Sequence, residues 1–497
     1  MRRAKIVATF GPATAGYEKT RDLLAAGVDV ARMNMSHGTY EVHEEQYHNI
    51  RKAAADLGRN VAIFADLQGP KIRLGLFKEK YYELKKDQTF TITTDDVVGD
   101  NTISSTTYKG QAGDVKPGDR LLLDDGKVAL MATAVEGNNV ITKVVVPGRI
   151  SNNKGINLPG VAVNVPALSD KDEDDLRWAL KLGVDMIALS FVRDARDIER
   201  VHEIMDEEGR RTPVIAKVEK PQAVDAITEV VDAFDAIMIA RGDLGVELPL
   251  EEVPVVQKKA IDLARRWAKP VIVATQVLES MIDNPRPTRA EASDCANAVL
   301  DGADAVMLSG ETSVGKYPVE AVEVMARIIE ATEKTDLDRI PPLGSKPRTR
   351  GGAVTRAAVE IAQQLSAQYL AAFTQSGDSA RRLSRLRPSQ PVYAFSHLES
   401  TVRILSLSWG IQPMLVVFAE NTDKMTAQVD RSLLEGNIAQ PNELVVLAAG
   451  SPPGVSGSTN LIKVHRIGDV ADREQLEQGI EPGPREPIGF WPAHSPR

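Results

Sequence analysis

The sequence PVIAKVEKPQAVDAITEVVDAFDAIMIARGDLG, residues 213–245, holds two short β-branched runs on either side of a segment with helical spacing. This order of strand, helix and strand is typical of a unit in a parallel sheet. Both runs end in charged residues, Lys217 and Glu219 in the first and Asp243 in the second. Polar residues at the ends of buried strands indicate a site at that edge of the sheet.

The same alternation continues over residues 5–331, apart from one interruption. It predicts a parallel sheet covered by helices. A closed (β/α)8 TIM barrel is favoured over an open doubly wound sheet, which the alternation also permits, because polar residues stand at the strand ends. The strand-like runs begin near Lys5, Val28, Val61, Val184, Pro213, Asp235, Pro270 and Asp304.

The interruption covers residues 73–165, where Gly-Asp turns separate runs of period-2 alternation. We expect an inserted all-β domain there, a β-barrel that hangs over the barrel mouth as a lid. The catalytic barrel would comprise residues 1–72 and 166–337. Renewed alternation in residues 338–470 predicts a C-terminal α/β domain. Residues 471–497 show no periodicity, and we expect a disordered tail.

Composition narrows the classes of function. The 497 residues are enough to bury several cores. Cys295 is the single cysteine, which excludes an intrachain disulfide and a multi-cysteine metal site. A net charge of −9 disfavours binding to nucleic acid or an anionic membrane. No apolar run approaches the ~20 residues of a membrane span, so we expect a cytoplasmic protein.

Two polar segments follow the second and third strand-like runs. The planar guanidinium of Arg32 can bind a phosphate with two hydrogen bonds, and the side-chain oxygens of Asn34 and Ser36 can bind a cation. Asp66 is suited to a cation and Arg73 to a phosphate. Each segment has a plainer interpretation, as a polar loop with a capping residue or as a surface ion pair.

Three later runs add a second group of candidates. Period-2 alternation places Lys217 and Glu219 on one face, as a point charge for phosphoryl oxygens and a ligand for Mg²⁺. Asp243 supplies a second carboxylate, and Gly242 allows a substrate carboxylate to approach the backbone. Thr275 places a hydroxyl where a proton could be delivered. A structural ion pair and a helix cap are the alternatives.

These motifs together resemble the pyruvate kinase family, closely over residues 5–335 and more loosely elsewhere. The resemblance implies a barrel with a β lid, a C-terminal effector domain and a homotetramer. It also implies phosphoryl transfer from phosphoenolpyruvate to ADP. The matching strings are ARMNMSHG (31–38), GPKIR (69–73), KVEK (217–220), IMIARGDLGVE (237–247), VIVATQVLESM (271–281) and DGADAVMLSGET (301–312).

The resemblance also implies roles for individual residues. Glu219 and Asp243 would hold one Mg²⁺, and a second would arrive with the nucleotide. Catalysis would use Arg32 and Lys217 on the phosphoryl group, and Thr275 in the network that protonates the enolate. Phosphoenolpyruvate would be bound by Arg32, Lys217, Gly242, Asp243 and Thr275. The nucleotide would be bound by Asn34, His37, Arg73 and Lys154.

One departure concerns the monovalent cation. Many members of the family bind K⁺ with residues that match Asn34, Ser36, Asp66 and a following threonine, opposite a glutamate. Here Leu67 replaces the threonine and lacks its hydroxyl, and Lys71 replaces the glutamate. An ammonium near Asp66 would supply the charge that K⁺ otherwise contributes, so we expect no requirement for K⁺. The alternative is a solvent-facing Lys71 with no such role.

A loop in the C-terminal domain resembles the family's effector-phosphate loop, and includes Thr374, Ser376, Gly377 and Ser379. It predicts a phosphorylated small-molecule effector. Asp378 adds negative charge, and the later loop 450–459 lacks the tryptophan and arginine of members activated by fructose 1,6-bisphosphate. A different sugar phosphate, a nucleotide or no effector remain as alternatives.

Two other functions are alternatives to phosphoryl transfer. A Mg²⁺-dependent aldolase or lyase could hold an enolate with Glu219 and Asp243, but it would not need Arg73, His37 and Lys154. A non-catalytic metabolite sensor could have lost Lys217 or Thr275, and both are present.

Overall fold

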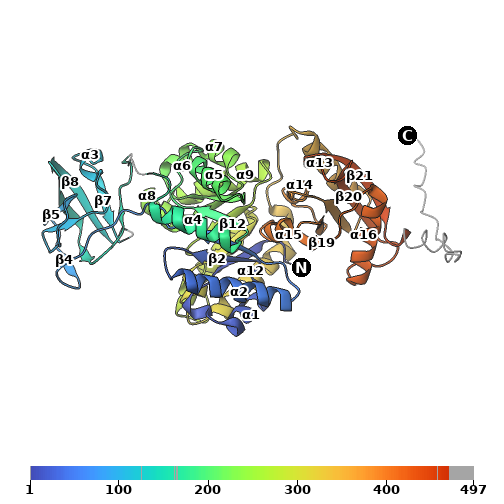
Figure 1. Ribbon diagram of the computed structural model, residues 1–497, viewed down its shortest axis with the longest axis horizontal. Coiled ribbons are helices and arrows are strands. Elements are labelled where there is room, and N and C mark those ends of the chain that lie inside the picture. Colours follow the sequence, from blue (N-terminus) through green and yellow to red (C-terminus); the bar gives the residue numbers. More distant parts are fainter. Residues whose placement is uncertain (1, 125, 162, 164–165, 456, 470–497) are drawn as a thin grey trace.

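The computed structural model describes residues 2–124, 126–161, 163, 166–455 and 457–469. Three bodies lie along one line, with the inserted β domain at one end, the barrel in the middle and the C-terminal α/β domain at the other end (Figure 1). The predicted tail, residues 471–497, lies outside the described residues.

Eight parallel strands close into a barrel in the order β1-β16-β15-β14-β13-β12-β3-β2. Closure occurs because β1 pairs with both β2 and β16, so that no strand has a free edge. The predicted TIM barrel is therefore confirmed, and the open sheet is excluded. The strands are β1 (Lys5–Thr9), β2 (Val30–Asn34), β3 (Ala62–Asp66), β12 (Met186–Leu189), β13 (Val214–Val218), β14 (Ala236–Ala240), β15 (Val271–Ala274) and β16 (Ala305–Leu308).

Amphipathic helices surround the barrel. One of them, α4, begins at Ser169, whose hydroxyl accepts a hydrogen bond from the Asp172 backbone N–H, and it ends at Gly183 in a left-handed conformation. The main helices are α1 (Tyr17–Ala25), α2 (Tyr40–Asp56), α4 (Asp170–Leu182), α5 (Asp197–Glu207), α7 (Ile227–Ala233), α9 (Val253–Arg266), α10 (Arg289–Leu300) and α12 (Pro318–Asp336). Shorter helical turns are η1 (Pro12–Thr14), α6 (Pro221–Asp225), α8 (Arg241–Glu247), η2 (Glu279–Ile282), α11 (Gly310–Ser313) and η3 (Leu337–Arg339).

Alternate residues of the barrel strands face two different cores. Val7 lies in the cluster that fills the barrel interior, and its neighbours Ile6 and Ala8 lie in the cluster beneath the helices. Leu407, from the C-terminal domain, belongs to the interior cluster. The C-terminal domain therefore closes the end of the barrel at which the strands begin.

The inserted segment forms a six-stranded sheet in the order β11-β7-β8-β9-β5-β6 and a two-stranded sheet of β10 and β4. The edge strands β6 and β11 each pair with one other strand, and residues 73 and 74 connect these two edges, since Arg73 bridges Gly155 before β11 and Leu74 bridges Thr106 after β6. The β-barrel expected here stays a prediction. The elements are β4 (Tyr82–Leu84), β5 (Thr89–Thr93), β6 (Ile103–Ser105), α3 (Gln111–Asp114), β7 (Arg120–Leu123), β8 (Val128–Glu136), β9 (Asn139–Val146), β10 (Gly148–Ile150) and β11 (Ile156–Asn157).

The C-terminal domain has a five-stranded sheet in the order β19-β18-β17-β20-β21. The last strand, β21, is antiparallel to β20 and was not predicted from the sequence. The elements are α13 (Arg350–Gln364), β17 (Tyr369–Phe373), α14 (Asp378–Ser384), β18 (Val392–Ser396), α15 (Glu399–Leu405), β19 (Ile411–Leu415), α16 (Thr422–Glu435), β20 (Leu444–Gly450) and β21 (Thr459–Arg466). None of the described helices combines the length and apolar composition of a membrane span.

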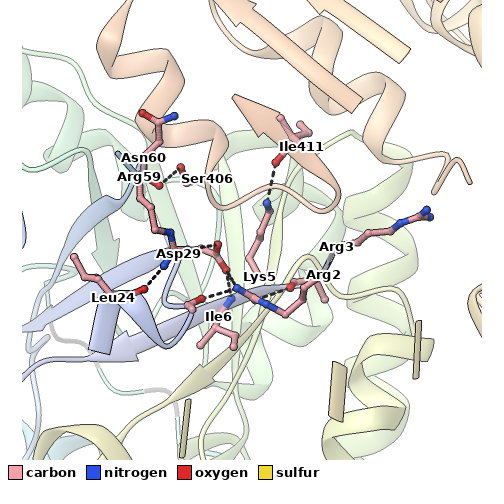
Figure 2. Close-up of polar contacts among 12 residues, drawn as sticks. Arg2, Arg3, Lys5, Ile6, Leu24, Asp29, Arg59, Asn60, Ser406 and Ile411 are labelled. Carbon is pink, nitrogen blue, oxygen red and sulfur yellow. Dashed lines mark hydrogen bonds and ion pairs between the residues drawn. The ribbon is translucent and has the colours of Figure 1, made fainter. Parts of the chain in front are cut away.

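Polar contacts join the barrel to the C-terminal domain at the beginning of the barrel strands (Figure 2). The buried Lys5 points from β1 toward the C-terminal domain, where its Nζ donates to the Ile411 carbonyl oxygen at 2.8 Å. Asn60 donates to the Pro413 carbonyl oxygen at 2.9 Å and accepts from Ser406 at 2.9 Å. These bonds pair backbone carbonyl groups across the junction, and the one from Lys5 is buried.

Candidate active site

Charged side chains from several strands meet where the barrel strands end. Arg32, at the end of β2, donates from Nε to the Asp66 carboxylate at 2.6 Å and from Nη1 to Thr9 Oγ1 at 3.0 Å. Asp66, the last residue of β3, is 1% exposed and also lies 3.2 Å from Lys217 Nζ. Burial disfavours the Asp66 carboxylate, but Lys217 and Arg32 outweigh that effect and lower its pKa. The group is therefore an ionised network.

Lys217 occupies the centre of this network. Its Nζ lies 2.9 Å from Glu219 Oε1 and donates to Ser190 Oγ at 2.7 Å. Burial disfavours the ammonium, but Asp66 and Glu219 more than compensate, so the pKa of Lys217 is raised. The ammonium is therefore permanently charged at neutral pH and is held in one position.

Two carboxylates beside Lys217 have the properties of a cation site. Glu219 is 1% exposed, and its Oε2 accepts from the Phe191 backbone N–H at 2.9 Å. Burial raises the pKa of Glu219, Lys217 opposes that change, and the Asp243 carboxylate on α8 adds to it. Two carboxylates that disfavour each other's charge fit a divalent cation. No group of three or more His, Cys, Asp or Glu residues that could hold a metal ion occurs among the described residues, so water and substrate oxygens would complete the shell.

Thr275 lies at the end of β15 with a positive φ of 67°. Its Oγ1 accepts from the Gly242 N–H at 2.6 Å and donates to the Ala274 carbonyl oxygen at 2.6 Å. Arg241 Nη2 donates to the Thr275 carbonyl oxygen at 2.9 Å. The structure thus brings Thr275 and Gly242 together, with the hydroxyl engaged by backbone.

The loop after β2 borders the open mouth of the barrel. Asn34 Oδ1 accepts from the Ser36 backbone N–H at 3.2 Å, and both side chains are half-buried. His37 is exposed and lines a cleft of about 2530 Å³ between the barrel and the lid, together with Lys71, Arg241 and Thr275. This cleft has room for a nucleotide.

The contacts of Arg73 and Lys154 lie within the inserted segment. Arg73 Nη1 donates to the Asn153 carbonyl oxygen at 3.0 Å, and Lys154 Nζ lies 2.8 Å from Asp124 Oδ1. Lys71 is half-buried at the base of the lid, where a Cβ on Gly155 would lie 2.9 Å from its Cε. Of these three cations only Lys71 lines the cleft, and the contacts given for Arg73 and Lys154 do not include the Lys217 network.

Leu67 has a different role from the one expected. Its side chain is 1% exposed and packs in the core beneath the helices. Its carbonyl oxygen accepts from Ser190 Oγ at 2.7 Å. The missing hydroxyl therefore points away from the mouth, and the prediction about K⁺ depends on Lys71 alone.

Sequence reasoning overlooked two residues that position this site. Ser190 joins Lys217 to the Leu67 carbonyl, and its own run carried no motif that could have indicated it. Glu247, on α8, is nearly buried and lies 2.6 Å from Lys220 Nζ and 3.0 Å from Asn157 Nδ2. It links the lid to the helix that carries Asp243, and it ends the string IMIARGDLGVE (237–247), for which the resemblance implied no role at this position.

The predicted effector loop lines a cavity of about 590 Å³ in the C-terminal domain. Thr374 Oγ1 accepts from the Gly377 N–H at 2.9 Å, Gly377 has a φ of 84°, and Ser379 Oγ lies 2.6 Å from Thr459 Oγ1. Ser376 is exposed at the same cavity. His397 and Phe418 form an edge-to-face pair at its wall, 5.1 Å between ring centroids.

The chain matches known families and proteins over most of its length. Residues 1–322 match "Pyruvate kinase, barrel domain", and residues 352–465 match "Pyruvate kinase, alpha/beta domain". It is 58% identical over 468 residues to a pyruvate kinase of Corynebacterium efficiens, covering 94% of this chain and 98% of that protein. It is 57% identical to a pyruvate kinase of Mycobacterium tuberculosis, covering 94% and 99%. A "Pyruvate kinase 2" of Synechocystis is 44% identical, covering 95% and 80%.

Proposed function

The chain belongs to the pyruvate kinase family and is a phosphotransferase, and we propose that it transfers the phosphoryl group of phosphoenolpyruvate to ADP. The observation that carries the proposal is the convergence of Arg32, Lys217 and Glu219 at one end of the barrel. A cation network of this kind stabilises the charge that develops on a transferred phosphoryl group.

Arg32 and Lys217 would act on the phosphoryl group. Both are held by Asp66, at 2.6 and 3.2 Å, so their positions are set before substrate arrives. As the bond to the enolate oxygen breaks, Lys217 would stabilise negative charge on the phosphoryl oxygens and the enolate. Gly242, in the first turn of α8, would lie beside the substrate carboxylate.

Glu219 and Asp243 would hold one Mg²⁺, and a second would arrive with the nucleotide. Support comes from the burial of Glu219 and the mutual repulsion of the two carboxylates. Mg²⁺ bound there would supply positive charge against the substrate oxygens. Glu219 Oε2 accepts from the Phe191 N–H and Oε1 lies 2.9 Å from Lys217 Nζ, so Mg²⁺ would bind the lone pairs that these two contacts leave.

The nucleotide would lie in the cleft between the barrel and the lid. His37 lines this cleft, and Asn34 is the last residue of β2, three residues before it. Arg73 and Lys154 belong to the lid segment. Movement of the lid toward the barrel would bring Lys154 to the nucleotide phosphates and exclude water. The bond between Glu247 and Asn157 would then act close to the hinge.

Thr275 would help to deliver the proton that converts the enolate to pyruvate. Its hydroxyl is engaged by the Gly242 N–H and the Ala274 carbonyl oxygen. Water held at this hydroxyl would therefore be the proton carrier, with Thr275 as its anchor.

We also propose that the enzyme is active without K⁺. Lys71 replaces the glutamate of members that need K⁺, and it lies at the cleft beside the lid. Its ammonium would take the place of a monovalent cation near Asn34, Ser36 and Asp66.

We also propose a homotetramer and a phosphorylated effector bound at the loop of Thr374, Ser376, Gly377 and Ser379. The cavity at that loop supports the second proposal, because Thr374, Ser376 and Ser379 line it and offer hydroxyl groups to a phosphate.

The test is pyruvate formation from phosphoenolpyruvate and ADP with Mg²⁺, in K⁺-free buffer and with saturating K⁺. We expect equal rates in both buffers and none after Mg²⁺ is chelated. Strong activation by K⁺ would keep the kinase but overturn the role of Lys71. Absence of turnover in both buffers would overturn the kinase itself.

A further inference from the structure

A polar cavity lies between the barrel and the C-terminal domain, at the beginning of the barrel strands and so opposite the candidate active site. Its volume is about 200 Å³ including its open mouth. The barrel contributes the end of α9 and the loops before β15 and β16, and the C-terminal domain contributes α14 and the residues after it. Five cationic residues and one carboxylate line it: Arg265, Lys269, Arg381, Arg385, Arg387 and Asp304.

The single carboxylate is already engaged. Asp304 Oδ2 lies 3.1 Å from Arg387 Nη2 and accepts from the Val271 N–H at 3.1 Å. Its Oδ1 accepts from the Trp409 N–H at 3.0 Å. Within the described part of the chain, no ion pair involves Arg265, Lys269, Arg381 or Arg385. The cavity therefore carries an excess of positive charge.

The other cationic side chains donate hydrogen bonds to backbone carbonyl oxygens. Arg265 Nη1 donates to Pro341 at 3.0 Å, and Arg385 Nη1 donates to Arg266 at 2.8 Å. Lys269 Nζ donates to Asp232 and Phe234. Carbonyl dipoles offset part of the cost of burial but do not neutralise a full charge. These bonds also support a simpler interpretation, in which the arginines only clamp the two domains together.

Hydrogen-bond donors without partners favour a binding site over a contact that only holds the two domains together. Ser408 is 2% exposed, and its hydroxyl has no hydrogen-bond partner. The Nε atoms of Arg265, Arg385 and Arg387 also lack partners, although these residues are 2%, 9% and 9% exposed. Buried polar groups in folded proteins are nearly always paired. Four unpaired donors on the walls of one cavity indicate a missing acceptor.

The pKa values of two arginines agree with this geometry. Burial, followed by the nearby Arg387, lowers the pKa of Arg265 to about 10. Burial, followed by Arg382 and Arg356, lowers the pKa of Arg385 to about 10. Burial and neighbouring like charges therefore destabilise the cationic forms of both arginines.

We propose that this cavity binds a phosphate-type dianion, either inorganic phosphate or the phosphoryl group of a small phosphomonoester. Its oxygens would accept from the free arginine Nε–H groups and from Ser408, and its charge would balance the excess cations. Because Arg265 belongs to the barrel and Arg385 to the C-terminal domain, the bound anion would join the two. Arg381 Nη1 donates to the Ser376 carbonyl oxygen at 3.2 Å, so the site would adjoin the effector loop without sharing its cavity.

The test is calorimetric titration of inorganic phosphate into the full chain at constant ionic strength. Lys269→Met removes a charge at the cavity, and Ser408→Ala removes only the unpaired hydroxyl. We expect at least about a tenfold weaker Kd for the first and about a threefold to tenfold weaker Kd for the second. Ser376→Ala in the effector loop and Arg73→Met in the proposed nucleotide site are matched controls, and neither should change this binding event.

A parallel titration with glycerol 1-phosphate identifies the source of the group. Binding as tight as that of inorganic phosphate would assign the site to phosphomonoesters, and binding only of inorganic phosphate would assign it to the free ion. Phosphate binding that both Lys269→Met and Ser408→Ala leave unchanged would overturn the proposal, as would no binding at all. Ser408→Ala keeps the test decisive if Lys269→Met fails to fold, because it deletes one unbonded oxygen.

Discussion

Replacement of Lys217 by methionine tests the proposed phosphoryl transfer most directly. The ammonium has three polar neighbours, Ser190 Oγ at 2.7 Å, Glu219 Oε1 at 2.9 Å and Asp66 Oδ1 at 3.2 Å. If its charge stabilises the transition state, its loss should lower kcat by about 10²–10³-fold, the effect of removing one preorganised electrostatic contact. Nucleotide binding should change by less than about threefold, because the proposed nucleotide ligands lie at the loop after β2 and in the lid segment.

The same substitution will also affect stability. It leaves the buried carboxylates of Asp66 and Glu219 without their shared cation, which costs about 3–5 kcal/mol. Asp66 keeps its bond from Arg32 at 2.6 Å, so we expect a value near the lower limit. Activity must therefore be measured on protein shown to be folded by circular dichroism, well below its Tm.

Two companion variants separate charge from position. Ser190→Ala keeps the ammonium but removes one bond that orients it, and kcat should fall only about threefold to tenfold. Lys316→Met, at an exposed ion pair with Asp283, should leave kcat unchanged. The reasoning is refuted if folded Lys217→Met retains kcat within tenfold of the unmodified chain.

Three further predictions concern the cation site, the backbone beside Ser190 and the single thiol. Lys71→Glu should make pyruvate formation depend on added K⁺, because the pocket then needs another cation; undiminished activity in K⁺-free buffer would contradict this. Gly69→Ala should lower stability by more than about 1–2 kcal/mol and lower kcat, because φ is 74° and a Cβ would lie 2.8 Å from Ser190 Cβ. Gly118→Ala is the control in denaturant titrations, because Gly118 has a φ of 100° and an added Cβ there would meet open space. Equal losses of stability in the two variants would show that the contact with Ser190 is not the cause. Burial raises the pKa of Cys295 to about 12, so a thiol reagent at pH 8 should label the native chain far more slowly than the unfolded one. The free energy of unfolding should also fall above about pH 8.5, because only the unfolded thiol loses its proton there. Equally fast labelling of the native and unfolded chains would show that the thiol is accessible and would contradict the prediction.

Much of the barrel and of its site could be predicted because their signals are local. Each barrel strand is a short apolar run ending in polar residues, and β13, ending beside Lys217 and Glu219, is typical. Parallel strands bring their ends to the same edge, so Arg32, Asp66 and Lys217 could be placed together from sequence order alone. The domain boundaries and the roles of the nucleotide residues stay predictions.

Other features could not be predicted, because they depend on contacts between distant segments. Ser190 lies at the end of a run without a recognisable motif, and its importance arises only because Lys217 Nζ is 2.7 Å away. The side chain of Leu67 was expected at the cation pocket but packs in the outer core, since that position faces the helices. The lid strands were predicted, whereas the way in which their edges are joined depends on residues 73 and 74, which bridge Gly155 and Thr106 from outside the strands.

The sequence by itself determined the order of strands and helices, the barrel class and the residues that carry charge, since periodicity and motif spacing are properties of the chain. Tertiary structure decided which charges neutralise one another. Lys217 lies beside Asp66 and Glu219, whereas Arg265 and Arg385 line one cavity between two domains, and neither forms an ion pair among the described residues. Coulomb energy depends on the distance between charges, and the desolvation cost depends on their burial. Neither the distance nor the burial can be read from the order of residues in the chain.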